Sequence, residues 1–384
     1  MKVLHFVRKN TQLKASFIQN QILNHLNYTP SVVYKNRTEK DDGGFAEFNN
    51  RDIDILNLDE KSCFFSKLKF KFIKIITLKD KERIKEFTKD SDILHFHYGT
   101  DAGIYLPLLK NINIPKVVSF YGYESSGFPR RFFGYGKQYL QKRVFRYADK
   151  VFAMSLDMKK DLMNIGCPEK KILVHYYGAD VHMFFMNHLY HEDNNNTNFL
   201  IIAGLTPQKG PIFLLKAFKK AQQANPDIQL DIVGDGSERD EMLQYIKQHD
   251  MGKYATWHGT TVYASEEHKK YLKNADVFVH PSVTDVNGDK EGIPGAIVEA
   301  MAAGLPVIST WHAGIPHIIS DGKTGLLVKE WDIEALKNAI LKIASDSTLR
   351  RYLGKNGQEY AKQNLDIKEK EVELERIYES LILK

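Results

Sequence analysis

The sequence predicts an α/β protein that contains two doubly wound parallel sheets. Short apolar, β-branched runs alternate with longer helical patterns along all 384 residues. These runs are apolar throughout rather than alternately polar, which is typical of strands buried on both faces of a parallel sheet. The chain is also longer than one hydrophobic core usually supports, roughly 250 to 300 residues. We therefore expect two Rossmann-like domains that face each other across a cleft.

The expected strands fall into two sets. In the first half they are residues 3–7, 53–56, 93–97, 116–120, 150–154 and 172–174. In the second half they are residues 199–203, 228–233, 277–280, 307–310 and 325–328. Because ligands bind at the carboxyl ends of such strands, functional residues are expected in the loops that follow them.

A polar segment separates the two sets. Residues 191–198 read His-Glu-Asp-Asn-Asn-Asn-Thr-Asn, without periodicity and rich in turn formers, which predicts a linker. It divides a domain of residues 1–190 from a second domain of residues 199–365. Residues 366–384 form a charged amphipathic pattern that predicts a final helix.

The charge is unevenly distributed. Residues 1–190 hold 31 Lys and Arg against 20 Asp and Glu, whereas the remainder holds 23 against 28. The first domain is therefore expected to face an anionic surface or substrate. Two cysteines, Cys63 and Cys167, form no disulfide framework, and no apolar run approaches the ~20 residues that span a bilayer. The expected location is the cytoplasm.

The most informative motif is a pair of carboxylates, Glu291 and Glu299, that frame the start of a helix. Pro294 suits the first helical position, and Gly304 with Pro306 marks the end. Glu291 is then expected in the loop before the helix and Glu299 in its second turn.

The free amides of Gly292, Ile293 and Gly295 would form an anion site at this helix N-terminus. A phosphate there, with a carboxylate on each side to accept sugar hydroxyls, would make a nucleotide-sugar site. The spacing alone fits equally an amphipathic helix with a solvated Glu at each end.

Two glycine-containing turns also follow expected strands. Lys209-Gly210-Pro211 combines a cation with a helix N-terminus, which can neutralise a diphosphate; a solvated Lys beside a capping Gly is the alternative. The motif from Gly234 to Arg239 lacks the third glycine of a dinucleotide fingerprint, so it indicates a tight strand-to-helix turn and argues against a nicotinamide dehydrogenase.

Polar aromatic residues follow two strands of the first half, as expected for an acceptor site. The residues concerned are His97, Tyr98, Tyr121, Gly122 and Glu124. His97 is expected at the rim, while His95 is expected to be a structural histidine. Either could be a metal ligand, but no third ligand has suitable spacing, so no metal is predicted.

Two basic, aromatic segments lie in the first half. Residues 128–146 include Arg130, Arg131, Lys142 and Arg143, and residues 64–74 alternate apolar and basic side chains. Both are typical of segments that bind anionic lipid. The alternatives are a core-facing helix with a solvated cationic back and an edge strand protected by lysines. No nucleic-acid module is visible, so nucleic acid is not an expected partner.

Together these residues resemble the family 4 retaining glycosyltransferases of GT-B architecture. The resemblance is carried by Leu205-Thr-Pro-Gln-Lys-Gly, Val233-Gly-Asp-Gly-Ser, Asn274-Ala-Asp-Val-Phe-Val-His-Pro-Ser and the Glu291-x7-Glu299 signature. Gly304-Leu-Pro-Val-Ile-Ser-Thr-Trp-His-Ala-Gly-Ile-Pro316 and Asp92-Ile-Leu-His-Phe-His-Tyr-Gly99 are similar to the branch that builds colanic-acid and amylovoran type exopolysaccharides.

The resemblance implies specific roles. Glu299 would hold the ribose hydroxyls, Glu291 the donor sugar, and Lys209 with the helix amides the diphosphate. Gly204, Gly210 and Pro281 would belong to the donor site, and Tyr121 to the catalytic site. No metal or other cofactor is implied, since the cation and the helix dipole stabilise the leaving group.

The implied reaction is a retaining transfer of a hexose from a nucleotide diphosphate sugar, UDP favoured over GDP. The departing phosphate oxygen would accept the proton of the acceptor. The implied acceptor is a lipid-linked saccharide in exopolysaccharide, capsule or O-antigen synthesis at the inner membrane face. The final helix would cross back to the first domain.

Three positions depart from the family pattern. Gly204 stands where a phosphate-binding Arg is usual, Tyr121 where a His is usual, and His317 where Glu is common. The first change removes a cation from the leaving-group site. A non-catalytic relative that binds glycan or lipid is therefore one alternative. A nucleotide-sugar epimerase, which also uses two facing doubly wound domains, is another.

Overall fold

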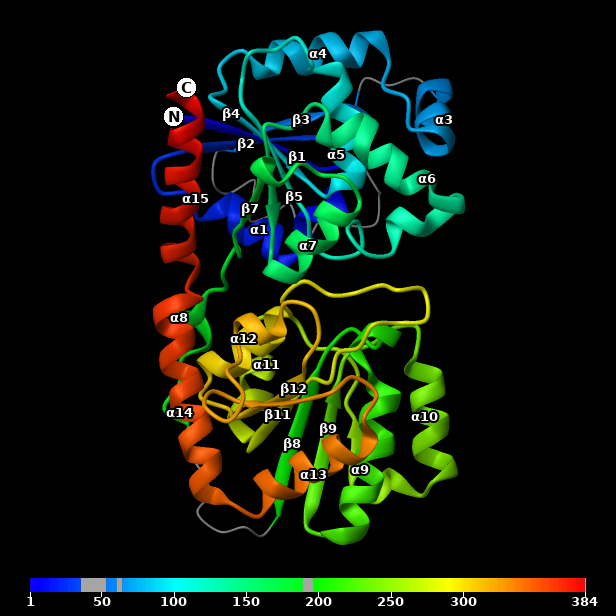
Figure 1. Cartoon of the computed structure of the whole chain (residues 1–384), viewed down its shortest axis with the longest axis vertical. Helices are drawn as coiled ribbons and strands as arrows, with labels where there is room; N and C mark the ends of the chain where they lie inside the picture. The colour runs from blue at the N-terminus through cyan, green and yellow to red at the C-terminus, as the bar shows by residue number, and fades with distance from the viewer. Residues whose placement is uncertain (36–52, 61–63, 189–195, 384) are drawn as a thin grey trace. The chain divides into compact units, whose positions relative to one another are not determined.

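The computed structural model describes residues 1–35, 53–60, 64–188 and 196–383, which form two compact units (Figure 1). Unit 1 contains Met1–Gly178 and the C-terminal segment Ile367–Lys384, and unit 2 contains Ala179–Asp366. The chain thus passes between the units at residues 178 and 366. Most of the expected linker, residues 191–198, lies outside the described residues.

Unit 1 contains a seven-stranded sheet in the order β3-β2-β1-β4-β5-β6-β7, and its neighbouring strands are parallel. Its strands are β1 Lys2–Phe6, β2 Thr29–Tyr34, β3 Asp54–Asn57, β4 Ile93–His97, β5 Lys116–Ser119, β6 Lys150–Ala153 and β7 Ile172–Val174. The chain starts at the centre, runs outward through β2 and β3, and returns to β4. The carboxyl ends of β1 and β4 therefore flank the switch point where such sheets bind ligands.

The helices of unit 1 include one correction to the expected elements. They are α1 Ser16–Leu23, α3 Phe64–Ile73, α4 Leu78–Thr88, α5 Gly99–Tyr105, α6 Arg131–Leu140, α7 Leu156–Asn164 and α15 Ile367–Ile382. Residues 64–73 are helical, so the alternative of a lysine-protected edge strand was wrong. This stretch has a single β-branched residue, Ile73, and its Leu and Lys residues are good helix formers.

Unit 2 contains a six-stranded parallel sheet in the order β10-β9-β8-β11-β12-β13. Its strands are β8 Thr197–Ile202, β9 Ile228–Val233, β10 Ala255–Trp257, β11 Val277–Val279, β12 Val307–Thr310 and β13 Leu326–Val328. Its helices are α8 Val181–Phe184, α9 Pro211–Ala224, α10 Arg239–Gln248, α11 Glu266–Asn274, α12 Gly295–Ala302, α13 Ile333–Ala344 and α14 Ser347–Asn364. Buried side chains of the sheet and of α9 and α13 form one continuous core.

Short helical turns connect several of these elements. They are η1 Asn10–Lys14, η2 Leu106–Leu108, η3 Phe128–Arg130, the π-helix η4 Gln141–Phe145, η5 Glu169–Lys171, η6 Pro207–Lys209, η7 Met251–Lys253 and η8 Ile315–His317. None of the described helices combines the length and apolar character needed to cross a membrane.

The two parallel sheets confirm the predicted fold class, although two strands were missed. β2 begins Thr-Pro-Ser, a sequence typical of a turn, and β10 has three residues. Both lie on the outer part of a sheet, where the apolar signal is weakest.

The C-terminal helix α15 is anchored inside unit 1 by buried polar groups. Glu375 accepts hydrogen bonds from the amides of Leu26 (2.7 Å) and Asn27 (2.9 Å) and from Asn27 Nδ2 (2.8 Å). Tyr378 contributes its hydroxyl, 2.6 Å from His95 Nδ1. Glu375 and Tyr378 are both buried, so the helix docks through satisfied polar groups as well as apolar contacts.

We expect Glu375→Ala to lower the free energy of unfolding of unit 1 by about 2–3 kcal/mol, because it leaves two backbone amides without their acceptor. Hydrogen exchange of unit 1 peptides in increasing urea measures this, since the three tryptophans, Trp257, Trp311 and Trp331, all lie in unit 2. The matched control is Glu373→Ala on the same helix. Its carboxylate is half exposed and paired with Lys370, so its loss should cost less than about 0.5 kcal/mol. Equal effects of the two variants would contradict this assignment.

Candidate active site

The carboxylate pair lies where the sequence placed it. Glu291 is in the loop before α12, and Glu299 is buried in the second turn of that helix. Pro294 is the N-cap rather than the first helical residue, with ψ at 121°, and Gly304 takes a φ of 86° just after the helix end. The helix N-terminus and its unsatisfied amides therefore begin four residues after Glu291.

Glu291 is held by a cation and a hydroxyl. Its Oε2 forms an ion pair with Lys209 Nζ, and its Oε1 accepts a hydrogen bond from Ser282 Oγ at 3.0 Å. Lys209 ends the turn η6, and Gly210 follows with a φ of 65°. A Cβ on Gly210 would lie 2.4 Å from the carbonyl oxygen of Pro281, so only glycine fits there.

The ion pair determines the protonation state of Glu291. Burial alone would raise the pKa of this carboxyl, but Lys209, His280 and His312 together outweigh that effect and the pKa is lowered. Glu291 is therefore a carboxylate at neutral pH while Lys209 is paired with it.

His312 holds the loop that contains Glu291 through a hydrogen bond to its backbone. His312 Nε2 accepts from the amide of Glu291 (3.1 Å), and its Nδ1 lies 2.8 Å from Glu330 Oε1. Glu330 also accepts from the amide of Thr284 at 2.6 Å. Sequence reasoning assigned no role to His312 or Glu330, because their contact joins loops that follow different strands.

Glu299 has a different environment. Burial raises its pKa to about 7, and the ring of His268 is its nearest ionisable neighbour, with Nε2 at 3.5 Å from Oε2. Burial also lowers the pKa of His268, so that ring is neutral and leaves the carboxylate uncompensated. The carboxylate oxygens of Glu299 can therefore accept hydrogen bonds from a bound ligand.

A cavity of about 390 Å³ in unit 2 is lined by Lys209, His268 and Glu299, among other residues. Its lining consists of Ile202, Ala203, Gly204, Lys209, Val233, Gly234, Asp235, Thr260, Thr261, Tyr263, His268, His280, Pro294, Gly295, Ala296 and Glu299. Four predicted donor-site residues, Gly204, Lys209, Gly295 and Glu299, are in this lining. The other five are not in the lining: Gly210, Pro281, Glu291, Gly292 and Ile293.

The cavity wall contains polar groups that sequence reasoning missed. His280 is buried, burial lowers its pKa to about 3, and neither ring nitrogen has a hydrogen-bond partner within the described part of the chain. It directly follows β11, so its place after a strand was a usable signal. His268 lies on α11, where no local pattern distinguishes it from a surface residue.

Two glycines leave open space along this wall. A Cβ on Gly204 would meet only the carbonyl oxygen of Asp235, at 4.0 Å, and a Cβ on Gly295 would meet only Glu299 Oε1, at 3.5 Å. The protein itself does not require glycine at these positions. A Cβ could therefore be added at position 204 without a clash.

The expected acceptor-side residues lie together in unit 1. Tyr121 packs against Phe17 (4.6 Å between ring centroids), Tyr98 (4.9 Å) and Tyr177 (6.0 Å). Tyr98 and Gly122 have positive φ angles of 65° and 146°. These loops follow β4, β5 and β7, so the aromatic rings gather at the carboxyl ends of strands as expected.

Glu124 is buried against the loops that follow β4 and β5. Its carboxylate accepts from the amides of Gly99 (3.4 Å) and Tyr121 (3.2 Å), it is buried, and burial raises its pKa to about 7. In this structure it ties the loop after β4 to the loop after β5 and presents no oxygen to solvent.

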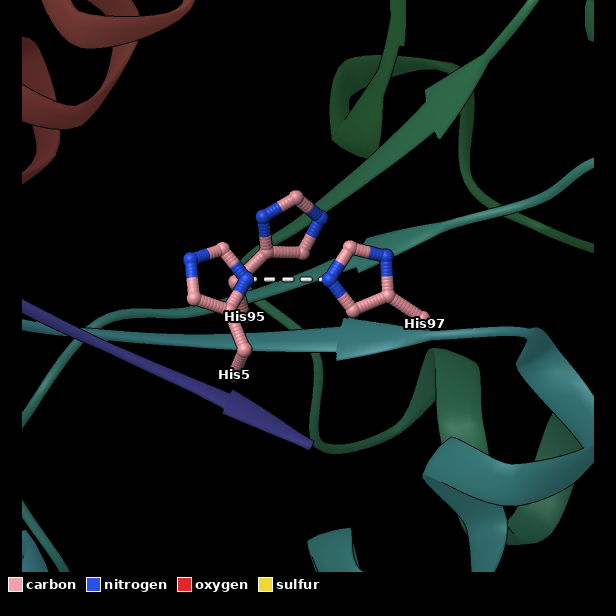
Figure 2. Close-up of side chains that lie close together, drawn as sticks. All are labelled: His5, His95 and His97. Carbon is pink, nitrogen blue, oxygen red and sulfur yellow. Dashed lines mark hydrogen bonds between the residues drawn. The ribbon is translucent and has the colours of Figure 1, made fainter. Parts of the chain in front are cut away.

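His97 was expected at the rim, and the structure corrects this. Its ring is fully buried behind Tyr121, with Nδ1 at 2.6 Å from the tyrosine hydroxyl. Rings from two strands meet here: His5 of β1 lies opposite His95 of β4, and His97 completes the group (Figure 2). The sequence offered no third histidine near His95 and His97, because His5 joins them only through strand pairing.

The basic residues expected at a membrane lie on the surface of unit 1. Arg130 and Arg131 are exposed, and Phe133, two residues further on, is fully exposed. Lys142 and Arg143 lie in the π-helix η4, where Arg143 Nε donates to the carbonyl of Gly103 at 2.7 Å. The guanidinium of Arg143 therefore contributes to the structure of unit 1 through this hydrogen bond.

Both halves of the chain match known glycosyltransferase models. Residues 29–182 match Glycosyltransferase Family 4, and residues 190–360 match Glycosyl transferases group 1. The amylovoran biosynthesis glycosyltransferase AmsK of Erwinia amylovora is 31% identical over 260 residues, which cover 68% of this chain and 62% of that protein. The putative colanic acid biosynthesis glycosyltransferase WcaL of Escherichia coli is 32% identical over 250 residues, 64% of this chain and 60% of that protein. The aligned regions span about three fifths of each relative's length.

A solved structure supports the fold along nearly the whole chain. Anabaena Alr3699/HepE in complex with UDP has a TM-score of 0.78 at 18% identity and covers 99% of this chain and 100% of its own. Its complex with UDP-glucose has a TM-score of 0.76 at 17% identity, with the same coverage. With a parallel sheet in each unit, these matches show that the chain belongs to the glycosyltransferases that join a family 4 domain to a group 1 domain in a GT-B fold.

Proposed function

We propose that this protein is a retaining hexosyltransferase that uses a nucleotide diphosphate sugar, UDP favoured over GDP, in exopolysaccharide, capsule or O-antigen synthesis. The observation that carries the proposal is the unit 2 cavity, where Lys209, the N-terminus of α12 and Glu299 share one wall. The relatives named for amylovoran and colanic acid support polysaccharide synthesis, and the UDP and UDP-glucose complexes of the Anabaena protein support the donor class.

The cavity wall suits a nucleotide sugar. Lys209 and the first amides of α12 would hold the diphosphate, because a helix N-terminus and a cation both favour an anion. Glu299 would accept hydrogen bonds from the ribose hydroxyls. The unpartnered ring of His280 supports a polar ligand as well, since buried polar groups in proteins nearly always have a partner.

We propose that bond cleavage depends on charge placed around the leaving diphosphate. Lys209 would move from Glu291 toward the phosphate, and the freed carboxylate would accept sugar hydroxyls. The cation and the helix N-terminus would stabilise the departing diphosphate, so the reaction is proposed to need no metal. The acceptor would attack from the face that the diphosphate leaves, which gives retention.

The acceptor is proposed to be a lipid-linked saccharide bound at the aromatic rings of unit 1. Tyr121, Tyr98 and Tyr177 offer ring faces and hydroxyls, a combination that suits a sugar. The exposed cations and Phe133 near α6 support attachment to the anionic inner face of the membrane.

Turnover of UDP- and GDP-sugars by the folded full chain tests the donor site. Lys209→Ala should lower kcat about 10²- to 10³-fold, as loss of a group that stabilises developing charge does. Lys216→Ala, an exposed lysine on α9, is the matched control and should leave kcat unchanged. Turnover should persist in EDTA.

Failure of folded protein to bind any nucleotide sugar would reject the proposal. Conversion of the donor sugar without an acceptor would instead identify an epimerase. Full turnover in Lys209→Ala would show that the site is placed wrongly.

The raised pKa of Glu299 predicts a pH dependence of UDP binding. Below about pH 7 the carboxyl is protonated in the free protein and one of its oxygens no longer accepts from ribose. Affinity measured by calorimetry should therefore rise roughly tenfold from pH 6 to pH 8. Glu299→Gln should bind UDP more weakly at pH 8, and its affinity should change with pH only as UDP itself titrates. If the variant's affinity changed with pH as in the wild type, the assignment would be contradicted.

Membrane attachment predicts charge-dependent binding to vesicles that contain anionic lipid. Arg130→Glu with Arg131→Glu should weaken co-sedimentation at least tenfold, since each cation near such a surface contributes about 1 kcal/mol. Lys247→Glu with Lys342→Glu makes the same charge change at exposed sites of unit 2 and should have little effect. Equal losses would show that only net charge matters.

A further inference from the structure

The segment that follows β12 in unit 2 holds the backbone at Glu291 by two hydrogen bonds. The amide of Glu291 donates to Nε2 of His312 at 3.1 Å. The carbonyl oxygen of the next residue, Gly292, accepts from the amide of Gly314 at 3.2 Å. A Cβ on Gly314 would lie 2.5 Å from that oxygen, so only glycine allows this close approach. The two bonds together fix the place where the Glu291 side chain leaves the backbone.

Glu330, two residues after β13, holds the start of the same loop. Its Oε1 lies 2.8 Å from His312 Nδ1, and its Oε2 accepts from the amide of Thr284 at 2.6 Å. Burial would raise the pKa of Glu330, but its hydrogen bonds with His312 and Thr284 outweigh that effect and the pKa is lowered. Glu330 is therefore a carboxylate at neutral pH. His312, Gly314 and Glu330 together form a clamp on the loop of residues 284–292.

The loop has a turn of its own between these attachment points. Oδ1 of Asp285 accepts from the amides of Asn287 and Asp289, both at 2.8 Å. Such a turn makes the loop a compact unit that can move only as a whole. The contacts at its two ends therefore decide where Glu291 lies.

The hydrogen bonds also fix the tautomer of His312. A backbone amide only donates, so Nε2 must carry the lone pair that accepts from Glu291. A carboxylate only accepts, so Nδ1 must carry the proton that His312 donates to Glu330. The buried ring is thus neutral, and both of its nitrogens are used. An apolar side chain of similar size would fill the space but would leave both partners without their hydrogen bonds.

The side chain of Glu291 is held differently from its backbone. Lys209 and Ser282 hold the carboxylate. In the proposed reaction Lys209 moves to the diphosphate, so the carboxylate loses its cation as the donor binds. The clamp uses the amide of Glu291 and the carbonyl of Gly292, neither of which is proposed to bind the donor. These backbone contacts can therefore persist when the ion pair is broken.

We propose that His312 and Glu330 are positioning residues for the donor sugar, which act by fixing the place of the Glu291 carboxylate. Neither residue is in the lining of the donor cavity. The inference rests on the proposed function, because it takes Glu291 as the residue that holds the sugar. Loss of the clamp should therefore impair the use of a nucleotide sugar and spare the binding of the nucleotide alone, which is assigned to Lys209 and Glu299.

The kinetic test uses His312→Leu, since leucine can occupy the buried site but can neither accept nor donate a hydrogen bond. The probes are release of UDP from UDP-glucose by the full chain and calorimetric binding of UDP. If the wild type turns over another nucleotide sugar instead, that sugar and its nucleotide replace them. We expect kcat/KM to fall about 10- to 100-fold, because a small displacement of a positioned group can cost as much as about 10²-fold.

The Kd of UDP should change less than about twofold in His312→Leu, because the lost interaction concerns the sugar. Equal losses in UDP binding and in kcat/KM would show a merely structural role and overturn the proposal. Glu330→Gln places an NH2 group against one of the two donors, His312 or Thr284. It should show the same sugar-dependent loss, and it serves if His312→Leu does not fold.

His312→Gln is the conservative variant, because its oxygen can accept from the Glu291 amide and its NH2 group can donate to Glu330. Most of the lost kcat/KM should return. His249→Leu is the matched control: His249 is a partly buried histidine of unit 2, 3.1 Å from Lys219 Nζ and outside the cavity lining. It should leave both measurements unchanged. If the Gln and Leu variants at position 312 were equally impaired, the hydrogen bonds would not be the cause and the proposal would fail.

Two further measurements do not depend on turnover. Nitrogen NMR of the ligand-free full chain with labelled histidine should show His312 neutral at pH 8, with its proton on Nδ1. Hydrogen exchange in peptides that cover residues 284–296 should be faster in His312→Leu than in the wild type. A proton on Nε2, or unchanged exchange, would overturn the clamp. If both results were as expected but the wild type used no nucleotide sugar, the clamp would stand, whereas the proposed function and the sugar-positioning role would be contradicted.

Discussion

The ion pair between Lys209 and Glu291 is the interaction on which the proposed donor site depends. A buried carboxylate is costly unless a cation and hydrogen bonds compensate it, and here Lys209 and Ser282 do so. In return the carboxylate holds a long, flexible lysine at the N-terminus of α12. Placing a cation there before a ligand arrives lowers the reorganisation that an anionic ligand would require.

Both candidate sites follow from the same property of parallel sheets. In unit 2, Lys209 follows β8 and Glu291 follows its neighbour β11, so two loops distant in sequence meet at one edge. In unit 1, β1 and β4 are neighbours, and their register places His5 opposite His95. The order of the strands thus decides which side chains can act together.

Sequence reasoning succeeded where a motif is local and failed where contacts depend on register. The Glu291–Glu299 spacing and the turn at Lys209 and Gly210 carry their own helix and loop signals. The structure places Lys209 and Glu299 in the lining of one cavity and pairs Glu291 with Lys209. The contact of His312 with Glu330 depends on how β12 and β13 pair. Because apolar runs do not encode such pairings, these contacts had no signal in a single sequence.

The polar interior of unit 1 is the clearest departure from what stability alone would select. His5, His95 and His97 occupy core positions where apolar side chains would avoid the cost of burying polar rings. That cost is limited because each nitrogen of these three rings has a hydrogen-bond partner, and the partner of His95 Nδ1 is the hydroxyl of Tyr378 on α15. The helix after residue 366 is therefore part of this network as well as of the packing. A fold that needed only a closed core could have used apolar contacts here, so packing alone does not explain these polar rings.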